Sequence, residues 1–188
     1  MEPILPKLVD DACRTLQGLV SQEDTFQEIA AAAVATLKSG GKILTCGNGG
    51  SAADAMHLAE ELVGRYRTNR RSLAGVSLTA DGTALTCIGN DFGFENVFSR
   101  QVEGLGNKND LLVCFSTSGN SPNILRALDA ARSKGVKSVA LLGKDGGKAK
   151  GKADFEIIVA NSDNGRIQEV HTLILHALLE VIEREIAS

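Results

Sequence analysis

The strongest constraint on the fold is a regular alternation of short aliphatic segments with longer helical ones. Segments with helical spacing lie near 51–66, 81–104, 121–134 and 165–186. Between them lie short runs rich in aliphatic and β-branched residues, at 42–46, 72–78, 110–115, 138–142 and 155–159. This alternation indicates βαβ units and a parallel sheet covered on both faces. We therefore expect an α/β protein, a three-layer α/β/α sandwich with a mainly parallel five-stranded sheet.

Two helical patterns precede the first expected strand. Apolar residues recur at three- and four-residue spacing from Leu5 to Leu19. A second, alanine-rich helix is expected to begin at Ser21 and to end before Gly40, because acids follow the serine and a glycine follows the last lysine. No linker-like stretch divides the chain. We therefore expect one domain over 1–188, with an N-terminal helical extension over 1–40 that makes contacts between subunits.

Charge and hydropathy exclude several classes of function. The formal net charge of −3 and the pI near 5.6 do not favour binding to nucleic acid or to an anionic membrane. No apolar stretch approaches the ~20 residues that a membrane-spanning helix needs, and the N-terminus does not have the pattern of a signal peptide. The four cysteines are scattered without a CxxC pair. A reduced, cytoplasmic chain is expected, with Cys46 and Cys114 as small buried hydrophobes.

Hydroxyl side chains are concentrated where the third expected strand meets its helix. A helix N-terminus leaves backbone N–H groups free and carries a positive dipole end, so it can hold an anion such as phosphate. A well-capped helix after a turn is the simpler interpretation, but a cap needs only one hydroxyl. Ser121 is the expected N-cap and Pro122 the first helical residue. The hydroxyl residues that favour an anion site are Ser116, Thr117, Ser118 and Ser121.

A second small polar loop, "GNGGSA" at 47–52, follows the first expected strand. Loops at the carboxyl ends of parallel strands meet at one edge of the sheet, so the two loops suggest one shared site. The glycine pattern also matches a dinucleotide-binding fingerprint. That fingerprint expects an acidic residue about 20 positions further on, where this chain is basic. Asn48 and Ser51 also supply side chains where a dinucleotide loop mainly needs bare backbone. Dinucleotide binding therefore remains the less favoured alternative.

Two helices carry groups that can bind a metal or move protons. His57 and Glu61 are four residues apart and share a helical face. They can ligate one metal, act as a base with its orienting partner, or form an ordinary surface pair. In the last helix Gln168 and His176 are eight residues apart, about 12 Å of helix rise. Both can bind one ion only if it lies between them and the glutamine side chain extends along the helix axis; otherwise one ligand must come from a neighbouring subunit. His176 can equally be a core histidine.

Several motifs, in order, resemble the phosphoheptose isomerases of the sugar isomerase (SIS) superfamily. They are "CGNGGSAADAMHLAEEL", "GNDFGF", "STSGNS", "GKDGGK" and "RIQEVH", and the resemblance runs from about residue 40 to the C-terminus. It implies a SIS fold of the flavodoxin-like kind. It also implies a homotetramer with active sites between subunits and one Zn²⁺ per subunit.

The resemblance assigns roles to individual positions. The four hydroxyl residues at 116, 117, 118 and 121 would hold the substrate phosphate. Glu61 and His176 would be the acid/base pair, and Arg65 would lie near the site, in a basic segment 65–71 otherwise expected to be solvated. Some relatives carry an acid where this chain has Gly165, which leaves Asp163 as the nearest carboxylate. The implied zinc ligands are His57, Glu61, Gln168 and His176. The implied contacts to the sugar are Asn48, Gly49, Gly50, Glu61, Asn90, Asp91 and Gln168.

The implied reaction converts D-sedoheptulose 7-phosphate to D-glycero-D-manno-heptose 7-phosphate through an enediol. It is the first step of bacterial nucleotide-activated heptose biosynthesis. The alternative is a non-catalytic SIS protein that senses sugar phosphates or binds a replication initiator. Relatives of the initiator-binding kind lack the helical glutamate, so Glu61 together with both histidines favours the enzyme.

Overall fold

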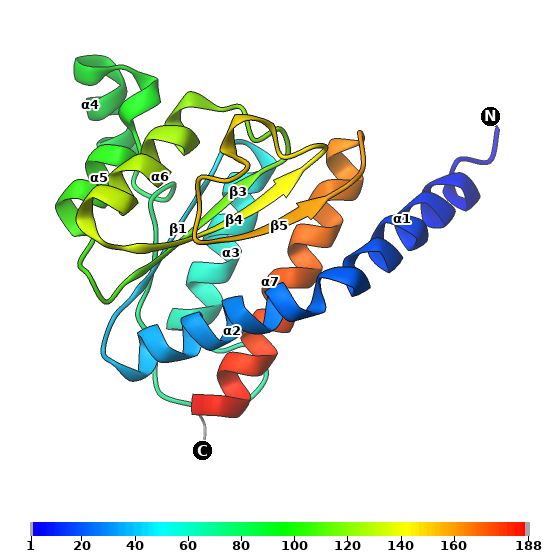
Figure 1. The fold of residues 1–188 in the computed structure, drawn as a ribbon, viewed down its shortest axis with the longest axis horizontal. Helices are drawn as coiled ribbons and strands as arrows, with labels where there is room; N and C mark the ends of the chain where they lie inside the picture. The colour runs from blue at the N-terminus through cyan, green and yellow to red at the C-terminus, as the bar shows by residue number, and fades with distance from the viewer. Residues whose placement is uncertain (1, 187–188) are drawn as a thin grey trace.

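The computed structural model describes residues 2–186 and shows a single parallel sheet between two layers of helices (Figure 1). All neighbouring strands pair in parallel, in the order β2-β1-β3-β4-β5. The expected α/β class and five-stranded sheet are therefore confirmed, and this strand order is the flavodoxin-like one. The strands are β1 (Ile43–Gly47), β2 (Gly75–Ser77), β3 (Leu111–Ser116), β4 (Lys137–Gly143) and β5 (Phe155–Val159).

The strand order reverses between β1 and β3. The chain adds β2 on one side of β1 and then crosses to add β3 on the other side. In open α/β sheets ligands bind outside the carboxyl ends of the strands at such a reversal. Both small polar loops follow these two strands, so the topology places them at the expected binding edge.

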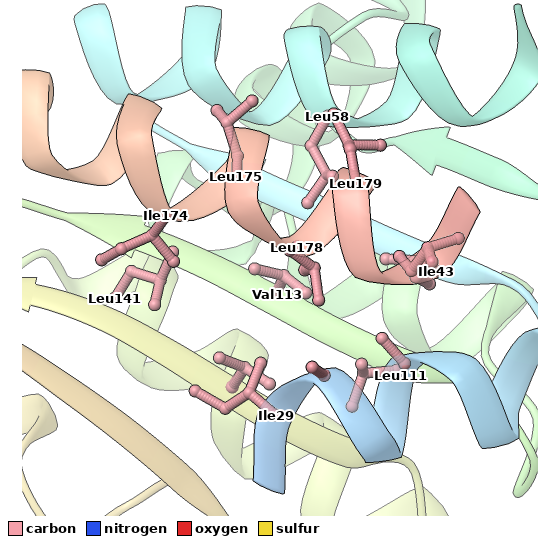
Figure 2. Close-up of a cluster of buried hydrophobic side chains, with 14 of the residues drawn as sticks. Ile29, Ile43, Leu58, Leu111, Val113, Leu141, Ile174, Leu175, Leu178 and Leu179 are labelled. Carbon is pink, nitrogen blue, oxygen red and sulfur yellow. The ribbon is translucent and has the colours of Figure 1, made fainter. Parts of the chain in front are cut away.

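Alternate strand residues supply the two faces of the sheet. Ile43, Leu111 and Val113 pack under helices α2, α3 and α7, as Figure 2 shows. The intervening residues Leu44 and Leu112 pack under α5 and α6. The helices are α1 (Leu5–Leu19), α2 (Glu23–Lys38), α3 (Gly50–Val63), α4 (Gly82–Phe92), α5 (Ser99–Leu105), α6 (Pro122–Lys134) and α7 (Asn164–Ile186), with 3₁₀ turns η1 (Val20–Gln22), η2 (Phe94–Asn96) and η3 (Gly147–Ala149).

Two helix boundaries differ from the sequence expectation. The single helix expected over 81–104 is broken into α4, η2 and α5, because Gly93 has a φ of +87°, which a helix cannot continue. The second helix begins at Glu23 rather than at Ser21. The Ser21 hydroxyl instead donates to the carbonyl of Gly18, so a 3₁₀ turn joins α1 to α2 almost without interruption.

The N-terminal helix α1 projects from the body of the domain (Figure 1). None of its residues is buried, and Leu5 and Val9 are among its exposed apolar side chains. Helix α4 likewise buries no residue. Among residues 2–186, no helix is long and apolar enough to cross a membrane.

Cys46 and Cys114 face each other from paired positions of β1 and β3, with their Sγ atoms 3.5 Å apart. Both are fully buried, as expected for small hydrophobes. The hydrogen bond with Cys114, together with burial, raises the pKa of the Cys46 thiol well above its usual value. The Cys46 thiol therefore stays protonated near neutral pH, and the two side chains lie at the ends of the strands that lead into the two loops.

Candidate active site

A pair of asparagines joins the two small polar loops. The side chains of Asn48, after β1, and Asn123, in the first turn of α6, exchange amide hydrogen bonds of 2.9 and 2.8 Å. Asn123 is buried, and its Oδ1 also accepts from the backbone N–H of Ile124. The shared site expected for the loops is therefore one connected unit. The sequence offered Asn123 only as one more polar residue of a helix start, and its role was missed.

The serine loop is held in shape largely by its own hydroxyls. The Ser116 hydroxyl accepts a 3.0 Å bond from the N–H of Gly119, and the Ser118 hydroxyl accepts from the N–H of Asn120 at 3.2 Å. A hydroxyl that accepts from the backbone still has its own hydrogen to donate to a ligand. Ser121 does occupy the N-cap of α6, but its side chain makes no capping bond. The predicted N-cap position is therefore confirmed, although the Ser121 hydroxyl does not itself form the capping bond.

A third loop, residues 144–148, packs against the serine loop. Gly119 has a φ of +60°, and a Cβ there would clash with the backbone carbonyl of Gly146. The N–H of Lys148 donates to the Asn120 side chain at 3.1 Å, and the N–H of Ala149 donates to the carbonyl of Gly119 at 2.9 Å. Glycine at 119 is therefore required both by the backbone angle and by the close approach of this neighbour.

Helices α3 and α7 run side by side in the same direction, which brings together residues distant in sequence (Figure 1). Gln168 lies against Gly50, where any Cβ would clash with its amide. One turn further, the Thr172 hydroxyl donates to Asp54 at 3.0 Å. Further still, the rings of His57 and His176 lie edge to face, 5.0 Å between centroids. Successive turns of α3 and α7 thus contact each other in register, and their side chains form one continuous surface.

The expected metal and acid/base residues are only partly brought together. His57 Nε2 lies 3.5 Å from Glu61 Oε1, and the His176 ring contacts His57. Ligand atoms of His57, Glu60 and Glu61 all lie within 4.8 Å of one another. Glu60, which is exposed, was not predicted as a ligand. Gln168 lies at Gly50, seven residues before His57, which is about 10 Å of helix rise.

Tyr66 is a site residue that sequence reasoning missed. Its ring stacks on His176 with 5.4 Å between centroids and 21° between planes. It lies just beyond α3, in the segment 65–71 that was expected to be solvated. Arg65 and Arg67 are exposed as expected, but the side chain of Arg70 is only 2% exposed. The expectation of a solvated segment was wrong for Arg70, whose charge is buried against Glu183.

Two titratable side chains of α3 and α7, Asp54 and His171, are buried. Burial raises the pKa of Asp54, although the Thr172 hydrogen bond and the charge of His57 lower it in part. Burial lowers the pKa of His171 to about 4, against the opposing effect of its contact with the Leu142 carbonyl. His171 is therefore neutral near pH 7. Its ring packs edge to face on Phe115 in the core.

Asn90 and Asp91 lie apart from the two loops. Both are exposed on α4, where the Asn90 amide donates to Asp91 at 2.7 Å. Helix α4 packs mainly on η2 at the rim of the domain (Figure 1). Near Gly165, Asp163 accepts from the backbone N–H groups of residues 165 and 166. The nearest carboxylate to this glycine thus lies at the first turn of α7 and bonds its free N–H groups.

The fold and the loops define a SIS domain, and a family model described as "SIS domain" matches residues 9–143. A phosphoheptose isomerase from Sodalis glossinidius is 51% identical over 184 residues, covering 96% of this chain and 94% of that protein. The solved phosphoheptose isomerase GmhA from Neisseria gonorrhoeae superposes with a TM-score of 0.89 at 41% identity, covering 96% of this chain and 97% of its own. One from Francisella tularensis has a TM-score of 0.88 at 34% identity, covering 97% and 100%.

The chain belongs to the phosphoheptose isomerase family of SIS-domain proteins. The predicted family, the fold and the aldose–ketose isomerase class are therefore confirmed. The dinucleotide alternative loses its remaining support in the structure. Asp81, the acid that follows β2, accepts from the N–H groups of Thr83 and Ala84 as the N-cap of α4. Its carboxylate serves the helix rather than a ribose.

Proposed function

We propose that this chain interconverts D-sedoheptulose 7-phosphate and D-glycero-D-manno-heptose 7-phosphate, the first step of bacterial nucleotide-activated heptose biosynthesis. The observation that carries the proposal is one grouping. His57, Glu61 and His176 lie together on paired helices, and α3 begins directly at the loop that Asn48 ties to the serine loop. Phosphate-binding groups and proton-transfer groups thus belong to one connected structure.

The proposed chemistry uses Glu61 as the base. It takes the proton from C1 of the ketose, and the resulting enediol is reprotonated at C2 to give the aldose. His176 moves the proton between O1 and O2, a transfer that positioned histidines commonly perform in acid–base catalysis. The 3.5 Å contact between His57 and Glu61 supports an oriented carboxylate rather than a freely rotating one.

The proposed phosphate site is the serine loop. Ser116 and Ser118 accept backbone N–H groups and keep their hydrogens for the phosphate. The Ser121 hydroxyl is not used as a helix cap, which leaves it free to bind an anion at the N-terminus of α6. Phosphate held here places the far end of the sugar toward α3 and α7.

We propose His57, Glu61, Gln168 and His176 as ligands of one Zn²⁺ per subunit. The donor set of imidazoles and oxygens suits zinc, and the grouping of His57 with Glu61 and His176 fits it. Gln168 can join this ligand set only if its side chain turns away from Gly50, which it contacts here, or if the Gln168 of another subunit is the ligand. When bound, zinc would polarise the substrate carbonyl.

We propose a homotetramer in which a second subunit completes each site. Asn90 and Asp91 are exposed on α4, apart from the loops that they are predicted to join. Helix α1 exposes a row of apolar side chains that suits packing against another copy. A cytoplasmic location is proposed as well, because the four cysteines are free and reducing compartments keep thiols free.

The activity is tested by mixing the protein with sedoheptulose 7-phosphate and following aldose formation. We expect turnover by the unmodified protein and at least ~100-fold loss of kcat in His176→Gln, the low end of acid–base contributions. No turnover, together with binding to a replication initiator, would instead favour the regulatory alternative. Near-normal turnover in His176→Gln would remove the role of that residue.

Zinc and assembly have separate tests. Dialysis against a chelator, followed by metal analysis and the same assay, should remove the metal and the activity together. Retained activity in metal-free protein would make zinc non-essential. Light scattering should give the mass of four chains, and Val9→Asp on α1 should lower it. A monomer with full activity would contradict the proposal that subunits share the site.

A further inference from the structure

A buried carboxylate, Glu183, organises the loop that follows α3. Glu183 lies near the end of α7, with its side chain only 5% exposed. Its two oxygens accept from the N–H groups of Tyr66, Arg67 and Thr68 at 3.0, 3.1 and 3.0 Å, and from the Thr68 hydroxyl at 3.0 Å. One side chain of α7 thus binds the backbone N–H groups of three consecutive residues in the loop after α3.

Arg70 completes this arrangement by linking the carboxylate to α3. Its Nε donates to Glu183 at 3.2 Å, and its terminal nitrogens donate to the backbone carbonyls of Glu61 and Leu62 at 2.6 and 2.9 Å. The last carbonyls of a helix have no partner within the helix. Arg70 therefore caps the C-terminal end of α3, in the same turn that carries the Glu61 carboxylate.

The same loop carries the ring that packs on the site. Tyr66 donates its N–H to Glu183 while its ring stacks on His176, which in turn contacts His57. His176 precedes Glu183 by seven residues, two turns of α7. Because the Glu183 carboxylate fixes the backbone at Tyr66, it also holds the Tyr66 ring against one face of the His176 ring.

We propose that Glu183 and Arg70 are positioning residues of the isomerase. They hold the Tyr66 ring on His176 and the last turn of α3, with Glu61, in the geometry that proton transfer needs. Neither residue touches substrate in this assignment. The proposed effect of Glu183 and Arg70 on catalysis rests on the proposed roles of Glu61 and His176. Their effect on the position of Tyr66 and of the end of α3 rests on the contacts alone.

The test pairs kinetics with a spectroscopic reading of His176. In protein with ¹³C-labelled histidines, the His176 ring signal is assigned by its loss in His176→Gln. Because a stacked ring shields its neighbour, Tyr66→Leu should move the His176 ring-proton signal downfield, and Glu183→Gln should move it the same way. Both variants should lose at least about tenfold in kcat, as expected for misplaced catalytic groups.

Two controls separate positioning from general destabilisation. Asp110 is another buried carboxylate, which accepts two backbone N–H groups and the Lys42 amine at the opposite end of the strands. Asp110→Asn should destabilise the fold without moving the His176 signal or lowering kcat. Tyr66→Phe keeps the stacked ring, so it should restore both readings. KM for the sugar phosphate should stay within about twofold in all folded variants, because the phosphate loop is untouched.

Two results overturn the proposal. One is a His176 ring signal that does not move in Glu183→Gln. The other is a Tyr66→Leu variant whose kcat equals that of the unmodified protein. Should Glu183→Gln not fold, Tyr66→Leu decides alone, since it leaves the buried ion pair intact. If the unmodified protein has no isomerase activity, the proposed function fails, while the His176 signal still decides whether Glu183 positions the ring.

Discussion

The two ends of the site are built in different ways. At the loop end, glycines, serines and asparagines bind one another mostly through backbone groups within a few residues, as Ser116 does with Gly119. At the helix end, side chains of α3, of the segment that follows it and of α7 meet across more than a hundred residues, as Arg70 beyond α3 does with Glu183 of α7. The loop end spreads its interactions over many small groups, whereas the helix end depends on a few buried charges and rings.

This difference predicts how each end responds to substitution. A small change in the loops removes one bond among many, so it should weaken binding of substrate while the fold persists. A change in the buried charges removes a group to which several others are attached, so it should alter stability and catalysis together. Four substitutions, taken from the largest expected effect to the smallest, test this contrast.

The largest effect is expected for Glu183→Gln. An amide in place of the carboxylate leaves the buried guanidinium of Arg70 without its counter-charge, and breaking such a pair costs about 3–5 kcal/mol. The free energy of unfolding, measured by urea denaturation, should fall by an amount in this range. Ser118→Ala is the matched control at the loop end and should change it by less than about 0.5 kcal/mol. Equal losses in the two variants would contradict the contrast.

The same carboxylate predicts a pH dependence of stability. Burial alone would raise the pKa of Glu183, but the N–H groups of Thr68, Tyr66 and Arg67 and the Thr68 hydroxyl outweigh it and lower the pKa from 4.5 to about 2. A depressed acid pKa adds stability that is full above the unfolded value and disappears as pH falls through the folded one. Between pH 4.5 and 2 the unmodified protein should lose stability more steeply than Glu183→Gln. Parallel curves would show that Glu183 does not contribute.

The next effect is expected for Glu61→Gln. The amide keeps the size of the side chain but cannot take the proton from C1, so kcat should fall at least ~100-fold. KM should change little, because the phosphate is held elsewhere. Glu28→Gln, an exposed glutamate on α2, is the control and should keep its kcat. Steady-state kinetics with sedoheptulose 7-phosphate measure both, and normal turnover by Glu61→Gln would exclude it as the base.

The loop end and the helix end of the site also differ in how far the sequence predicted them. The strands, the serine loop and the shared edge were predictable because aliphatic runs and small polar loops are local signals. The i, i+4 spacing of His57 and Glu61 was equally visible. The break at Gly93 was missed, because a glycine inside a helical pattern does not reveal its backbone angle until neighbouring segments have packed.

The buried charges were missed because their partners are far apart in sequence. Arg70 lies in a run of basic residues that looks solvated, and only the fold places Glu183 beside it. One signal was available. Glu183 follows the buried Leu179 by four residues, so it lies on the inner face of α7, where an acid needs a partner.

A smaller effect is expected for Ser118→Ala. Losing one hydroxyl donor to a charged phosphate costs about 1.5–3 kcal/mol, so KM should rise by about tenfold to a hundredfold. The kcat should stay close to normal, since the proton-transfer groups lie on other elements. Inhibition by inorganic phosphate, measured in parallel, should weaken by a similar factor. A fall in kcat with unchanged KM would reverse the proposed division of labour.

The smallest effect is expected for Asn123→Ala, which removes the amide pair between the two loops. Asn48 loses both of its bonds to Asn123, but the two loops still follow β1 and β3, which pair directly with each other. The two lost bonds are worth about 0.5–1 kcal/mol each, but they join the loops to each other rather than to substrate, so KM should rise only about fivefold without a lower kcat. Asn120→Ala offers the comparison, because it cuts the bond to Lys148 while sparing Asn48. If Asn123→Ala lowered kcat as strongly as Glu61→Gln, the loop end would carry catalysis as well as binding, and the two ends would act as one.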